Sequence, residues 1–142
     1  MTKWRSVMPA LALLVLGGRA GTAQGQVCIN EVLYDPAGPD AGTEFVELYN
    51  TSPQSVSLAG WRLEAGNGAV PGDWRVQWQG EAGHAIRPGA FFLVAGESVA
   101  GAADARAALS LQNGPDAVRL VSPLGTADLL GWGAHTHPEF HE

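Results

Sequence analysis

Residues 74–79 of the chain read WRVQWQ, and this stretch decides the class of fold. Its two tryptophans and its valine alternate with polar side chains, and a period of two is the pattern of a β-strand with one buried face. Gly80 and Gly83 then mark a turn. The alternation therefore predicts a strand over 74–79, followed by a reversal of the chain.

Similar stretches lie on both sides of this strand. Residues 27–34 (VCINEVLY) and 43–50 (TEFVELYN) are rich in β-branched and aromatic residues and end at turn signals. Residues 91–95 (FFLVA) are apolar at every position, which predicts a central strand covered on both faces. Residues 98–109 are rich in Ala and favour one or two helical turns. The other predicted strands are 55–58, 60–63, 117–121 and 127–132.

Short strands with turn signals about every 8–12 residues indicate an all-β sandwich or barrel. Two sheets would bury one apolar set between them. Trp61 would be a large anchor of this core, because a buried aromatic side chain removes about 150–250 Å² from water. The expected core residues are Ile29, Leu33, Phe45, Leu58, Trp61, Leu63, Phe91, Leu93, Val118, Leu120 and Leu129.

The amino terminus has the layout of a secretory signal peptide. Lys3 and Arg5 precede ten mainly apolar residues at 7–16, and small residues around Ala23 follow them. A spanning helix needs about 20 apolar residues, whereas basic, apolar and small segments in this order are typical of an export signal. We therefore expect a signal peptide at 1–23, a mature domain at 24–142, and a secreted, cell-surface or periplasmic location.

The expected mature chain is acidic. Cleavage after Ala23 leaves 119 of the 142 residues, which suits one domain with one core. It leaves five Arg against 14 Asp and Glu, a net charge of −9, and this balance argues against a surface for nucleic acid phosphates. Cys28 has no partner for a disulfide within the chain, and we expect it to be a small apolar residue at the start of a strand.

Several segments, taken in order, resemble the lamin tail domain. The resemblance implies an immunoglobulin-like β-sandwich and carries over no catalytic residue. The export signal and the lack of coiled-coil heptads favour the bacterial secreted type of this family. The matching segments cover most of 27–132 and read INEV at 29–32, EFVELYN at 44–50, LAGWRL at 58–63 and IRPGAFFLVA at 86–95.

For function, the resemblance implies a non-catalytic extracellular or cell-surface binding or scaffolding module. Its partner would be a protein or a surface polymer. In the family, a segment like residues 138–142 leads into a last strand. We therefore expect that strand to be missing from a chain that stops at Glu142.

Two carboxylates, Glu31 and Glu47, fall among apolar residues of their predicted strands. Such a pair can act as general acid and base, or each can accept hydrogen bonds from backbone N–H groups or Arg. Since no Ser or His constellation accompanies them, we favour the structural role and expect no enzyme. Asn30 and Asn50 would satisfy loop backbone groups. The structural motif is then Asn30, Glu31, Glu44, Glu47, Asn50 and Trp61.

The carboxy terminus carries a cluster of histidines. His135, His137 and His141 lie within seven residues, beside Glu139. Imidazoles two residues apart share one face of an extended segment and are a ligand type for Zn²⁺, but no Cys accompanies them. We expect no cofactor, with zinc at these three histidines as the alternative. On that alternative, the chain is a small metal-binding accessory protein of a secreted hydrolase.

Overall fold

The computed structural model describes residues 26–38, 41–70 and 72–133. This part of the chain is all β, and it contains no helix long and apolar enough to cross a membrane. The strands are β1 (Val27–Leu33), β2 (Phe45–Asn50), β3 (Val56–Ser57), β4 (Arg62–Asn67), β5 (Trp74–Gln79), β6 (Ala85–Ile86), β7 (Phe91–Ala95), β8 (Ala105–Arg106), β9 (Asp116–Ser122) and β10 (Gly125–Trp132).

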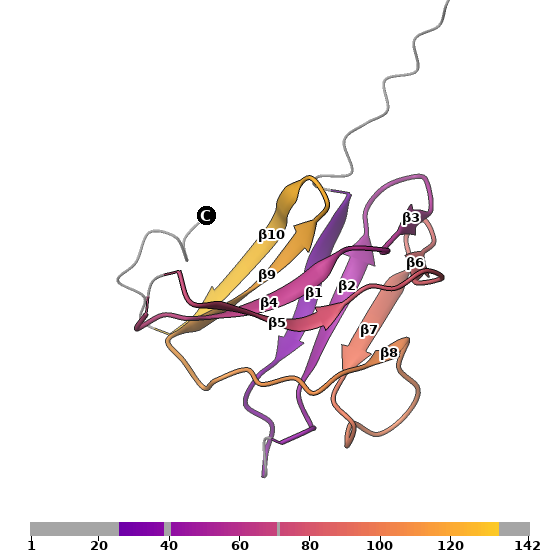
Figure 1. The fold of residues 1–142 in the computed structure, drawn as a ribbon. Helices are drawn as coiled ribbons and strands as arrows, with labels where there is room; N and C mark the ends of the chain where they lie inside the picture. The colour runs from indigo at the N-terminus through magenta and orange to yellow at the C-terminus, as the bar shows by residue number, and fades with distance from the viewer. Residues whose placement is uncertain (1–25, 39–40, 71, 134–142) are drawn as a thin grey trace, which may run out of the picture.

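The strands form two four-stranded sheets that pack face to face (Figure 1). One sheet has the order β1-β2-β7-β8, the other has the order β10-β9-β4-β5, and β3 and β6 form a small pair at one end. All neighbours are antiparallel except β7 and β8. The predicted all-β sandwich is therefore confirmed.

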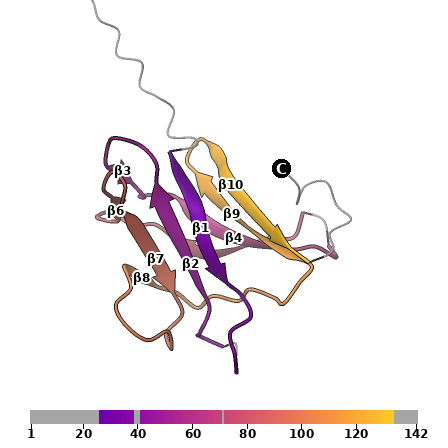
Figure 2. The ribbon, with the colours of Figure 1, turned by 180° about the vertical axis from the view of Figure 1, so that it is seen from behind.

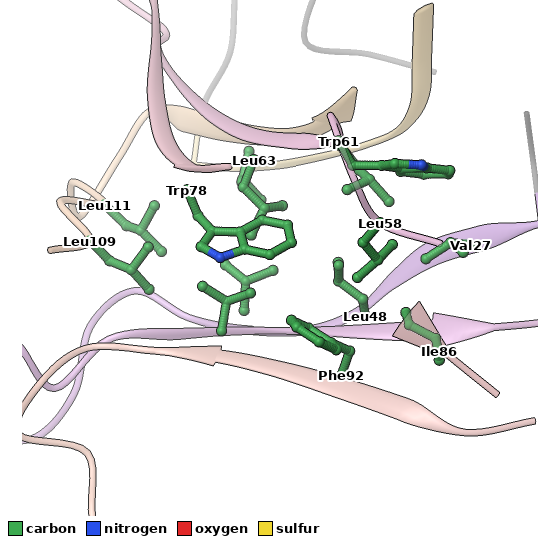
Figure 3. Packing of buried hydrophobic residues seen from close by; sticks show 14 of the residues in the cluster. Val27, Leu48, Leu58, Trp61, Leu63, Trp78, Ile86, Phe92, Leu109 and Leu111 are labelled. Carbon is green, nitrogen blue, oxygen red and sulfur yellow. The ribbon is translucent and has the colours of Figure 1, made fainter. Parts of the chain in front are cut away.

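The core lies between the two sheets (Figure 3). Trp78 of β5 packs against Phe92 of β7 with ring centroids 5.6 Å apart, and Trp61 is 2% exposed. Leu109 and Leu111, from the segment between β8 and β9, are buried in the same cluster. The other buried members are Val27, Val46, Leu48, Val56, Leu58, Leu63, Ile86, Val94, Val118, Leu120 and Trp132.

A close backbone approach explains the glycine that follows β5. Gly80 donates its N–H to Trp61 and accepts the N–H of Gly60. A Cβ atom at residue 80 would lie 1.9 Å from the carbonyl oxygen of Leu58. Only glycine lets the β5 end approach the β3–β4 turn this closely.

One side of the sandwich is closed by β1 and β10, which belong to different sheets. Asp128 Oδ2 on β10 accepts the Ile29 N–H on β1 at 2.7 Å. Where the two strands end, the ring of Tyr34, just after β1, stacks on that of Trp132, the last residue of β10, with centroids 4.5 Å apart. The start of β1 and the end of β10 lie at opposite ends of the sandwich (Figure 1). The chain thus enters the fold at one end and leaves it at the other.

The predicted strands 74–79 and 91–95 match β5 and β7 residue for residue. The predicted helical turns at 98–109 are wrong, because this Ala-rich segment is an extended loop that contains β8. Asp104 holds that loop to the sheet by accepting the Leu93 N–H at 2.8 Å. The prediction that β7 is covered on both faces is also wrong, since Phe91 is 52% exposed.

A bulge explains why Leu33 was assigned to the wrong face, and another turns Val76 of β5 outward while Trp78 points into the core. The pairing of β1 with β2 shifts between Ile29 and Glu31, and that of β5 with β4 shifts between Val76 and Trp78. An extra residue in one strand reverses the sides on which all later residues point. Ile29 packs against the core, but five residues predicted to be buried are wrong: Leu33, Phe45, Phe91, Leu93 and Leu129 are partly or largely exposed.

Candidate functional site

Three residues of the sequence motif lie in the interior. Glu44 is 2% exposed, and its Oε1 accepts the Leu111 N–H at 2.8 Å, which fastens the segment between β8 and β9. Asn50 is fully buried and donates from Nδ2 to the carbonyls of Gln54 and Ile86. With Trp61 in the core, these three residues hold the fold together.

The other three motif residues lie on the outer face of the β1-β2-β7-β8 sheet, which the view from behind presents (Figure 2). The strand register places them there beside apolar side chains of β1, β2 and β7. We call this surface the acidic face. It consists of Asn30, Glu31, Leu33, Phe45, Glu47, Tyr49, Phe91 and Leu93.

The bulge at Asn30 creates this face. In a regular ladder with no bulge, Asn30 would pair with Glu47. Glu31 would then pair with Val46 and point inward. The bulge instead sets Glu31 opposite Glu47 in the register. Asn30 donates its side-chain N–H to Glu47 Oε1 at 2.7 Å. A short-range irregularity in β1 therefore brings two carboxylates and an amide together on the surface.

The two carboxylates face each other without a cation. Residues directly opposite on neighbouring strands have Cβ atoms about 4.5–5.5 Å apart, and like charges there repel. Among the described residues, the ion pairs belong to Glu64 and Asp73, and neither Glu31 nor Glu47 is in one. Glu31 is exposed and Glu47 is half-buried. The sequence-based expectation of backbone N–H or Arg partners is replaced here by a single amide donor.

Aromatic side chains adjoin the carboxylates. Tyr49 and Phe91 pack with ring centroids 4.9 Å apart at an interplanar angle of 35°. Phe91 is exposed despite its size, and Leu93, opposite Glu47, is half-buried. Along β2 the acidic face thus places Glu47 between Phe45 and Tyr49, and β7 adds the apolar side chains of Phe91 and Leu93.

The outer face of the other sheet is built differently. There Glu64 accepts hydrogen bonds from Arg62 Nε at 2.9 Å and Arg119 Nε at 2.8 Å. The Arg119 guanidinium lies 4.1 Å from the centroid of the Trp74 ring. Burial by itself would raise the pKa of Glu64, but the hydrogen bonds and charges of the two Arg residues outweigh it, so the pKa lies below its ordinary value of 4.5. We call this set the arginine face.

The open side of the sandwich, between β5 and β8, holds a hollow of about 440 Å³ lined in part by Trp78, His84 and Arg106. Two of its polar side chains are occupied by local structure. Arg106 donates to the carbonyls of Gly96, Val99 and Gly101, and His84 Nδ1 accepts the Glu81 N–H at 3.0 Å. These contacts stabilise turns at the hollow, which the exposed Gln79 and Glu81 also line.

A family model for the lamin tail domain matches residues 20–134, which is most of the chain. The chain belongs to the lamin tail domain family. No curated protein matches it. The fold is accordingly an immunoglobulin-like β-sandwich, and the family is a generally non-enzymatic, protein-interaction type of domain.

In this lamin tail domain, the histidines at 135, 137 and 141 lie outside the described residues, as does the expected signal peptide. Within the described part, no group of three or more His, Cys, Asp or Glu residues is placed to hold a metal ion. The zinc alternative and the cleavage site stay predictions.

Sequence reasoning missed the aromatic part of the acidic face by assigning Phe91 and Leu93 to the core. A signal was present in β7, where apolar residues occupy both parities although one sheet face packs on the core. Apolar residues at the outward positions of such a strand indicate a surface with another use.

Proposed function

We propose that this lamin tail domain is a non-catalytic binding or scaffolding module of the cell exterior that docks a protein through its acidic face. The observation that carries the proposal is the exposed Phe91, packed on the half-buried Tyr49, beside Glu31 and Glu47, which form no ion pair with the described chain. Aromatic residues are enriched at protein interfaces, and contiguous apolar groups on a surface mark interaction sites. The export signal expected at residues 1–23 supports an extracellular or periplasmic setting.

A photo-crosslinking experiment tests the proposal. A photoreactive phenylalanine analogue replaces Phe91 in the chain carrying its own amino terminus, and the producing cells are irradiated. Val76, which is 55% exposed on the other sheet, supplies the matched control position. We expect discrete crosslinks to an exported or surface protein from position 91 and not from position 76. Equal crosslinking at both positions, or none at position 91, contradicts the proposal.

A second experiment addresses catalysis. The purified protein is assayed against generic esterase, phosphatase, nuclease and glycosidase substrates, with and without Zn²⁺, Mg²⁺ and Ca²⁺. We expect no turnover. A turnover that survives repurification and disappears in Glu31→Gln, Glu47→Gln or His137→Ala would replace the binding module with an enzyme.

A further inference from the structure

We propose that the acidic face binds a basic, extended segment of a partner protein, with an Arg or Lys side chain seated at Glu31 and Glu47 and an apolar side chain on the Tyr49–Phe91 pair. This inference rests on the proposed function, and it specifies the chemistry of the partner.

The charge argument begins with the opposed carboxylates. Asn30 donates to Glu47 Oε1. The exposed Glu31 and the half-buried Glu47 lie opposite each other on neighbouring strands, and neither forms an ion pair with the described chain. A guanidinium carries five N–H donors in a planar fork and bonds to carboxylates through two parallel hydrogen bonds. One cationic side chain inserted here removes the repulsion between the two glutamates and satisfies their oxygens.

The cation has to come from outside the described chain. Arg62 and Arg119 are held by Glu64 on the opposite sheet, and Arg75 pairs with Asp73. Arg106 is occupied by three loop carbonyls. Arg87 lies in the exposed turn before β7 and forms no ion pair with either carboxylate. No arginine of the described chain pairs with Glu31 or Glu47, so a partner would have to supply the positive charge.

The spacing of the face favours an extended partner. Glu47 and Tyr49 are two residues apart on β2 and point the same way. An extended segment presents every second side chain on one side, at intervals of about 6.6–6.8 Å. A segment lying along β2 therefore places a basic residue at Glu47 and an apolar residue, two positions away, at the Tyr49–Phe91 pair. The aromatic rings also attract a neighbouring cation.

A second copy of this chain fits the face less well. The mature chain expected from cleavage after Ala23 has a net charge of −9, and charge of one sign opposes self-association. The arginines of the opposite face are already bound to Glu64. A nucleic acid would meet the same repulsion.

Synthetic peptides test the inference directly. The probe is a fluorescein-labelled nonapeptide in which arginine and leucine alternate at odd positions and serine fills the even positions. The control probe has glutamate in place of arginine. Binding to the purified chain is measured by fluorescence anisotropy at low and moderate salt. We expect the arginine peptide to bind saturably and the glutamate peptide not to bind. The affinity for the arginine peptide should fall as salt rises, because salt screens exposed charges.

Variants locate the binding site. The double variant Glu31→Gln, Glu47→Gln is expected to lower the affinity for the arginine peptide at least about tenfold. The reason is that hydrogen bonds between charged groups are stronger than those between neutral groups. The matched control Glu81→Gln, Glu97→Gln removes the same charge at two exposed positions outside this face and is expected to bind like the parent. Phe91→Ser is expected to weaken binding with the salt dependence kept. Circular dichroism verifies that each variant is folded.

Several outcomes overturn the inference. Equal binding of the arginine and glutamate peptides does so, as does no binding of either, or an equal loss in the two double variants. Self-association of the parent chain that Glu31→Gln, Glu47→Gln abolishes would assign the face to a second copy instead. If position 91 crosslinks a cellular protein while the arginine peptide fails to bind, the binding module stands and the basic partner is wrong.

Discussion

The two outer faces of the sandwich differ in whether the chain supplies cations to the glutamates on them. Each carries glutamate beside an aromatic side chain. On the arginine face, Glu64 is enclosed by Arg62 and Arg119, with Trp74 against the second guanidinium. On the acidic face, Glu47 has only the Asn30 amide and faces another carboxylate. On the first surface the described chain supplies two cations for one carboxylate, and on the second it supplies none for two.

The comparison shows that glutamates in strands of one domain can differ in burial and in hydrogen-bond partners. Glu64 is 6% exposed, and a carboxylate at that depth is tolerated because both of its oxygens are bound by guanidinium groups. Glu31 and Glu47 stay at the surface, where water can solvate them. The position of a glutamate in a strand therefore does not by itself say whether the chain supplies its cation.

Both faces rest on one core, so the largest expected effect comes from breaking that core. Trp61→Ala should lower the free energy of unfolding by about 3–5 kcal/mol, the range for removing a large buried aromatic. Phe91→Ala removes an aromatic of the acidic face, and this exposed position should cost less than about 1 kcal/mol. Urea denaturation of both variants measures the difference. Similar losses in the two would mean that Phe91 belongs to the core.

The next largest effect separates the two kinds of glutamate. Glu64→Gln removes the charge that Arg62 and Arg119 bind and should destabilise the fold by about 1–3 kcal/mol. Glu47→Gln removes one of two like charges that face each other and should change stability by less than about 0.5 kcal/mol. The two melting temperatures check this. A greater loss for Glu47→Gln would reverse the comparison.

A third experiment sharpens the comparison through pH. The pKa of Glu64 is lowered in the folded state, so its ionised form stabilises the fold. That contribution is fully present above the ordinary value of 4.5 and is lost as pH falls through the lowered pKa. Between pH 5 and 3, the stability of the parent should therefore fall more steeply than that of Glu64→Gln. If stability falls equally with pH in the parent and in Glu64→Gln, the ionised Glu64 does not stabilise the fold.

The smallest effect uses a native reporter beside the acidic face. Cys28 pairs with Tyr49 in the register. Burial first, and the Asp128 charge second, raise the pKa of its thiol. Asp128→Asn should lower that pKa and speed alkylation at pH 8 a few-fold, because the thiolate is the reactive form. Iodoacetamide labelling followed by mass measurement checks the rate, and a slower reaction would contradict the assigned charge effect.

Most of the longer strands were predictable from sequence, whereas β6, β8, the extent of β4 and the side on which residues point were not. Alternation located β5 and an unbroken apolar run located β7, both residue for residue, because apolar and β-branched residues favour strands. It failed at Asn30 and Gln77, where one extra residue lets the same alternation point to opposite sides. A bulge depends on the partner strand, and no local pattern around Asn30 reports the register of β2.

In the candidate site, too, the two glutamates could be predicted from sequence and their arrangement could not. Glu31 and Glu47 were singled out from sequence, but their opposition follows from the bulge in β1. Glu64 drew no attention because its partner Arg119 is 55 residues away along the chain. Long-range pairing of this kind is decided by the order of strands in the sheet, which the sequence alone does not state.

The entry and exit of the chain at opposite ends of the sandwich have a mechanical consequence. A force applied between residues 26 and 133 would pull β1 and β10 along their own lengths (Figure 1). Such a force loads the β1–β2 hydrogen bonds together, in shear, instead of opening them one after another. We expect optical-trap pulling between these points to require a higher unfolding force than pulling between residues 80 and 133. The fold would then serve a scaffold not only as a surface for a partner but also as a link that carries tension.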